Sequence, residues 1–159
     1  MFGLFKSPRV HDGQLGELSR SRGLWRGTIA LESSGTVPLA VSGGRTKPDA
    51  QALALARQVT AHFPSWRPAI AAALFEHYAP YADAQEAGEL ESPDEPVPPI
   101  DGPDQVWEYV QVSHVAVTPL SGLLTTEIAF NAAWDEEHTL GARFQAGRLV
   151  ELCGSVISP

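Results

Sequence analysis

The polar run Asp135-Glu136-Glu137-His138 is the densest group of side chains in this sequence that could do chemistry. It follows Trp134 and precedes a stretch in which apolar residues alternate, so we place it where one strand ends and the next begins. Three carboxylates and an imidazole are donors that can hold a divalent cation. Neighbours along a chain seldom all face one centre, so a metal site would need a further ligand from elsewhere, and His114 is the best candidate.

Two interpretations of this cluster follow from the residue types. In the first, Asp135, Glu137 and His138 bind a metal ion with help from His114 and support a small metal-dependent hydrolase. In the second, one carboxylate accepts backbone amide hydrogens and fixes a turn, while His138 packs on Trp134. We expect the second, structural role. Trp134, Asp135, Glu137, His138 and His114 are the candidate binding residues, and we assign no catalytic residue and no cofactor.

Other motifs that would indicate a reaction are absent from the sequence. It contains no metalloprotease helix motif, no paired-cysteine zinc pattern and no phosphate-binding loop spacing. The single cysteine, Cys153, cannot form an internal disulfide, and we expect a small buried side chain there. Whether the protein is an enzyme is left open, and we lean toward one that is not.

The elements that must position the cluster can be predicted from apolar spacing. Alternating apolar residues predict about three strands before residue 45 and about four strands after residue 105. Between them, Thr46 can cap a helix that Pro64 ends, and Ser65 can cap a second helix that Ala79-Pro80 closes. We therefore predict an α+β fold, in which two central helices cover one face of an antiparallel sheet of about seven strands.

One irregularity of the sheet is also visible in the sequence. The apolar phase shifts near Ser113-His114, from Val110 and Val112 to Val115 and Val117. A shift of this kind predicts a β-bulge.

Charge is distributed unevenly along the 159 residues, which we treat as one domain over 1–159. The net charge is −8, and residues 68–142 contain fourteen Asp and Glu but no Lys or Arg. A segment of that sign repels phosphate, which argues against a nucleic-acid partner. It favours a basic protein as the partner instead.

Residues 83–104 differ in character from the rest, with eight acidic residues and five prolines. Such a composition buries little apolar surface, so we predict a mobile surface loop there that is not needed for folding. Met1–Lys6 is too short for a signal peptide, and no apolar run approaches the length of a membrane span. We therefore expect a cytoplasmic protein that does not associate with membranes, and a homodimer is left open.

The cluster also carries a resemblance to known proteins. Trp134-Asp135-Glu136-Glu137-His138, followed by Gly141, Phe144 and Gly147, resembles the C-terminal signature of uncharacterised bacterial domains. In those domains Trp-Asp-x-Glu-His precedes a glycine-containing strand and a hairpin, and some of them look like immunity or accessory proteins of bacterial toxin systems. The resemblance implies a bacterial origin and a small α+β fold, and it implies no reaction. We therefore expect a non-enzymatic binding protein, immunity- or inhibitor-like, whose acidic surface meets a basic partner.

Overall fold

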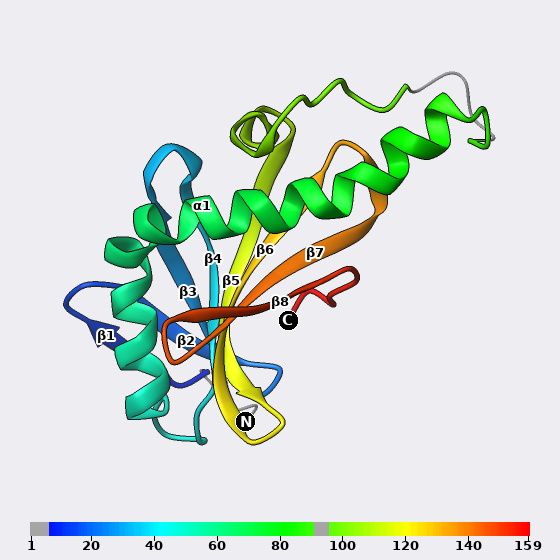
Figure 1. The fold of residues 1–159 in the computed structure, drawn as a ribbon. Coiled ribbons are helices and arrows are strands. Elements are labelled where there is room, and N and C mark those ends of the chain that lie inside the picture. The colour runs from blue at the N-terminus through cyan, green and yellow to red at the C-terminus, as the bar shows by residue number, and fades with distance from the viewer. Residues whose placement is uncertain (1–6, 91–95) are drawn as a thin grey trace.

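The computed structural model describes residues 7–90 and 96–159, and it shows an α+β fold with one long helix against one sheet (Figure 1). The helix α1 spans Ala50–Glu86, and short 3-10 helices span Glu32–Ser34 and Pro103–Glu108. The strands are β1 (Arg9–Asp12), β2 (Gly16–Ser21), β3 (Leu24–Leu31), β4 (Gly35–Val41), β5 (Val110–Leu120), β6 (Leu123–Ala132), β7 (Asp135–Gln145) and β8 (Arg148–Cys153). No described helix is both long enough and apolar enough to cross a membrane.

The strands lie side by side in the order in which they occur along the chain. Every neighbouring pair is antiparallel except β4 and β5, which run parallel with Leu39 opposite Val115 and Val41 opposite Val117. Parallel neighbours cannot be joined by a tight turn, so the chain must cross the sheet between them. The helix α1 makes this crossing and therefore lies over one face (Figure 1).

The two predicted helices are one helix in the structure, so that prediction was only roughly right. We expected Pro64 to end the first helix, but α1 continues through Pro64, Pro68 and Pro80. A proline removes one backbone hydrogen bond, and this loss bends a helix instead of ending it when apolar residues on both sides are buried. Phe63 and Ile70 provide that burial. Figure 1 shows α1 changing direction part-way along its length, and we attribute this change to the prolines.

The core lies between α1 and the face of the sheet that it covers. Buried alanines near the start of α1 allow a close approach to the sheet, and larger side chains follow them along the same face. The buried residues of the helix are Ala52, Ala56, Val59, Phe63, Ile70, Ala71, Leu74 and Tyr78. They pack against one alternating row of each central strand, which includes Trp25, Ile29, Leu39, Val115, Ile128, Phe130 and Leu140.

The sheet has eight strands and not about seven, because β1 was not expected. This strand has only four residues, and its sequence does not alternate between apolar and polar. It is fixed by Asp12, whose buried carboxylate accepts the amides of Gln14 and Leu15 at 2.9 Å and the Nε–H of Arg57 at 2.8 Å. The Asp12 side chain thus joins the β1–β2 hairpin to α1. The β-bulge predicted near His114 is confirmed by a shift in register between Val112 and His114.

The segment expected as a loop over 83–104 begins and ends in helices, and its described residues between them form no regular helix or strand. The helix α1 continues to Glu86, and a 3-10 helix begins at Pro103. Between them, the Tyr78 hydroxyl donates to Pro98 O at 2.6 Å and accepts the amide of Ile100 at 3.2 Å. The part of the loop prediction that concerns 91–95 lies outside the described residues, as does the prediction made for 1–6.

Replacing Asp12 with Asn should lower the free energy of unfolding by about 2 kcal/mol, because hydrogen bonds to charged groups contribute about 1.5–3 kcal/mol. The hydrogen bond from Arg57 lowers the pKa of Asp12 to about 2. The stabilisation is therefore complete above roughly pH 4, the ordinary pKa range of a carboxyl, and is lost as the pH falls toward 2. Urea unfolding at a series of pH values checks both expectations.

The matched control for this experiment is Glu17→Gln, because Glu17 pairs with Arg9 at an exposed position of the same hairpin. That variant should unfold like the wild type. Equal stability of the Asp12→Asn variant and the wild type at pH 7 would show that this carboxylate does not anchor the hairpin.

Candidate functional site

Asp135 is the first residue of β7 and follows directly on the two-residue turn Ala133-Trp134. We expected residues 135–138 to reverse the chain, and this was wrong, because the reversal is complete before Asp135. Ala132 pairs with Asp135, whereas Asn131 pairs with Thr139. The residues 136–138 therefore bulge out of the ladder, which explains why the alternation of apolar residues is lost there.

The carboxylate of Asp135 is the centre of a hydrogen-bond network. It is 7 % exposed, and its Oδ1 accepts the backbone amide of His138 at 3.2 Å and lies 2.9 Å from His138 Nδ1. Its Oδ2 accepts the hydroxyl of Tyr81 at 2.8 Å. Burial on its own would raise the pKa of Asp135, but the hydrogen bonds from Tyr81 and His138 outweigh it and hold the pKa below its usual value. The carboxylate is thus ionised and fixed from both sides.

His77 of α1 lies between this network and Trp134. Its Nδ1 accepts the indole Nε1–H of Trp134 at 3.0 Å, and its Nε2 lies 4.0 Å from Asp135 Oδ2. An indole can only donate, so His77 Nδ1 carries no proton and the ring is neutral with its proton on Nε2. Burial lowers the pKa of His77, which favours this neutral form, although the charge of Asp135 acts in the opposite direction.

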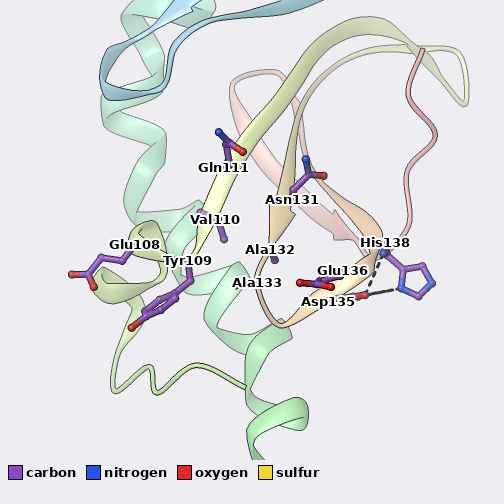
Figure 2. Close-up of a pocket in the computed structure, with 10 residues that line it drawn as sticks. All are labelled: Glu108, Tyr109, Val110, Gln111, Asn131, Ala132, Ala133, Asp135, Glu136 and His138. Carbon is purple, nitrogen blue, oxygen red and sulfur yellow. Dashed lines mark hydrogen bonds and ion pairs between the residues drawn. The ribbon is translucent and has the colours of Figure 1, made fainter. Parts of the chain in front are cut away.

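Two hollows flank the start of β7, each with a volume of about 430 Å³. Figure 2 shows the first, with Glu108 and Tyr109 on one side and Asp135, Glu136 and His138 on the other. The amide side chains of Gln111 and Asn131 complete its polar lining. The second hollow lies toward α1 and is lined by Tyr81, Leu90, Val97, Trp134, Glu137 and their neighbours. Volumes of this size fall within the range of ligand-binding pockets.

The structure brings together three of the five predicted binding residues, Trp134, Asp135 and His138. Glu137 is exposed at the rim of the second hollow. His114 does not converge on the group, because it faces the other side of the sheet, where its Nε2 lies 3.9 Å from Glu127 Oε1.

Neither detailed expectation for the cluster is met in full. Asp135 does accept a backbone amide, as expected of a structural carboxylate. His138 is bound to Asp135, and it is His77 that contacts Trp134. Within residues 7–90 and 96–159, no group of three or more His, Cys, Asp or Glu side chains is arranged to hold a metal ion.

Sequence reasoning missed His77 and Tyr81, which supply the helix side of the network. The available signal was their spacing, because residues four apart lie on the same face of a helix. Tyr78 follows His77 directly and is buried, which places this part of the helix against the sheet.

Residues 14–157 match a family described as "Domain of unknown function (DUF6985)". The chain belongs to this family. The DUF6985 match covers every element except β1, and it includes the whole network around Asp135. None of the curated proteins and none of the solved structures matches the chain.

Trp134→Ala should lower the free energy of unfolding by about 3–5 kcal/mol, as truncation of large buried aromatic side chains does. The indole is 5 % exposed and packs edge-on against Tyr78, 5.5 Å between ring centroids. Trp134→Phe keeps most of the packing and removes the bond to His77, so it should cost about 1 kcal/mol. Denaturant unfolding measures both. A loss below about 1 kcal/mol for Trp134→Ala would mean that the ring contributes little to the core.

His77 should titrate below pH 6.5 in the folded protein, and Trp134→Phe should raise its pKa, because Nδ1 is then free to take a proton. A histidine with a depressed folded pKa stabilises the protein fully above about pH 6.5, and this contribution is lost as the pH falls below that value. NMR titration of the imidazole signals measures the pKa in both proteins. An identical pKa in wild type and variant would contradict the assigned hydrogen bond.

Proposed function

We propose that this protein is a non-enzymatic binding protein whose acidic surface docks a basic protein partner. The observation that carries the proposal is the lining of the first hollow. Glu108, Asp135 and Glu136 are among its lining residues, and all of its lining residues lie within residues 68–142, which contain no Lys or Arg. No Lys or Arg of that segment repels a positively charged side chain that enters this hollow.

Exposed carboxylates of the described residues also occur on the elements at this end of the molecule. They come from the second half of α1, from residues 96–108 and from the start of β7, which meet at one end of the molecule (Figure 1). These residues are Glu76, Asp83, Glu86, Glu89, Asp101, Asp104, Glu108, Glu136 and Glu137. Their summed field attracts a basic surface before contact and repels nucleic-acid phosphates.

The side chains inside the hollow suit the end of an arginine or lysine side chain. Carboxylates such as Glu136 accept charge-assisted hydrogen bonds from a guanidinium or ammonium group. The ring of Tyr109, which also lines the hollow, attracts a cation through its face. Gln111 and Asn131 add amide oxygens as further acceptors. We therefore propose a basic side chain of the partner as the group that enters.

The resemblance carried by residues 134–138 supports a more specific version of this role. We propose an immunity- or inhibitor-like protein of a bacterial cytoplasm, whose basic partner is a toxin. The alternative, a metal-dependent hydrolase that uses Asp135, Glu137 and His138, has less support. Both oxygens of Asp135 are already engaged by Tyr81 and His138, and Glu137 does not join them.

A binding assay with a hexa-arginine peptide tests the proposal by comparing two double variants of equal net charge. Glu108→Gln combined with Glu136→Gln should weaken binding by about tenfold or more, because each removes a charge-assisted contact. The control combines Glu17→Gln with Glu32→Gln, which neutralises two exposed carboxylates outside residues 68–142. It should weaken binding far less. Equal effects of the two pairs would show that the hollow has no special role.

A further inference from the structure

The strands β4 and β5 pair with each other over only part of their length. Their parallel ladder joins residues 39–41 to residues 115–117, although β4 begins at Gly35 and β5 begins at Val110. No described strand pairs with residues 110–113 on the side of β4. Figure 1 shows the two strands separating toward the end of the sheet at which β5 begins. We call the gap between residues 35–38 and residues 110–113 the fork.

A proline and a bulge end the ladder at the fork. The Ser42 amide donates to Val117 O at 3.0 Å, which fixes the hydrogen-bond pattern of the parallel pair. Continued toward the fork, this pattern requires the amide of residue 38 to donate to Ser113 O. Residue 38 is a proline and has no N–H. The register shift of β5 falls at the same level, so the fork is a consequence of the sequence on both strands.

The free edge of β5 turns backbone hydrogen-bonding groups into the fork. Tyr109 O accepts the Ala133 amide at 2.9 Å on the side of β6. In a trans peptide the C=O and the next N–H point in opposite directions, so the Val110 N–H points away from β6. Backbone directions alternate along a strand, so the N–H and C=O of Val112 also face the fork. An added strand supplies the partners that such an edge lacks.

A hollow of about 210 Å³ lies at the fork. Its lining comes from the residue before β4, from α1, from the 3-10 helix before β5 and from β5 itself, and it includes Ser34, Arg67, Trp107, Val110, Gln111 and Val112. Arg67 lies with its guanidinium carbon 4.2 Å from the centroid of the Trp107 ring, and it pairs with Glu32 at 3.5 Å. Because Glu32 balances its charge, Arg67 repels a basic segment less than a free guanidinium would.

The hollow at the fork adjoins the first hollow, which contains the carboxylates. Val110 and Gln111 line both of them. Gln111 pairs with Asn131, and these two exposed side chains lie on the face of the sheet toward which the first hollow opens. Every second side chain of a strand added beside Gln111 points to that same face. One extended segment can therefore pair with β5 and direct a side chain to the first hollow.

We propose that the basic partner presents an extended segment whose backbone pairs with β5 at Val110 and Val112, while one of its basic side chains enters the first hollow. This inference rests on the function proposed above and adds the conformation in which the partner binds. In such a complex the main-chain hydrogen bonds contribute affinity, and the hollow selects the side chain.

Two peptides of equal charge test the proposal. Hexa-arginine is compared with a hexa-arginine that is N-methylated at every residue, which keeps the guanidinium groups but cannot donate backbone hydrogen bonds to β5. The methylated peptide should bind at least about tenfold more weakly. Glu108→Gln combined with Glu136→Gln should weaken the binding of both peptides, because the first hollow acts on charge. Equal affinities of the two peptides would overturn this inference and leave the proposed function standing, whereas no binding of either would overturn both.

Hydrogen exchange of the full chain locates the added strand. Saturating hexa-arginine should slow exchange of the Val110 and Val112 amides by about tenfold or more, because both become hydrogen-bonded. The amides of Gly13 and Gly147, which lie in hairpin turns elsewhere on the sheet, should exchange as before. Unchanged exchange at Val110 and Val112 in the saturated protein would contradict pairing at this edge.

Discussion

The ionised carboxylate of Asp135 is the contact on which this end of the molecule depends. One of its oxygens accepts the hydroxyl of Tyr81 from α1, and the other contacts His138 from β7. His77, which accepts the indole N–H of Trp134, lies beside it. A buried charge is tolerated only when hydrogen bonds replace its lost water, and here they come from both layers of the fold. Glu136 and Glu137 follow directly on this anchored residue, and they line the hollows beside the start of β7.

The helix side of this contact is a consequence of topology. Because β4 and β5 are parallel neighbours, the chain has to cross one face of the sheet between them, and α1 is long enough to extend past the core. Its second half thereby carries His77 and Tyr81 to the turn between β6 and β7. Tyr78, on the same part of the helix, binds Pro98 and Ile100 and places the segment that follows beside the first hollow.

The α+β class and the bulge near His114 could be predicted because each leaves a local pattern of apolar residues. Other features could not be predicted from local patterns. The prolines of α1 indicated a helix end, but burial on both sides of Pro64 kept the helix continuous. β1 is held by the pairing of Asp12 with Arg57, which are distant in the sequence. The hydroxyl that binds Asp135 Oδ2 comes from Tyr81, on a helix more than fifty residues away, so only the fold could reveal it.

A double-mutant cycle on Tyr81 and Asp135 tests the central claim, that this carboxylate joins α1 to β7. The free energies of unfolding of Tyr81→Phe, Asp135→Ala and the double variant would be compared with that of the wild type. A hydrogen bond to a buried charged group predicts a coupling energy of about 1.5–3 kcal/mol. Effects that add to within about 0.5 kcal/mol would contradict the account, because the two side chains would then stabilise the protein independently.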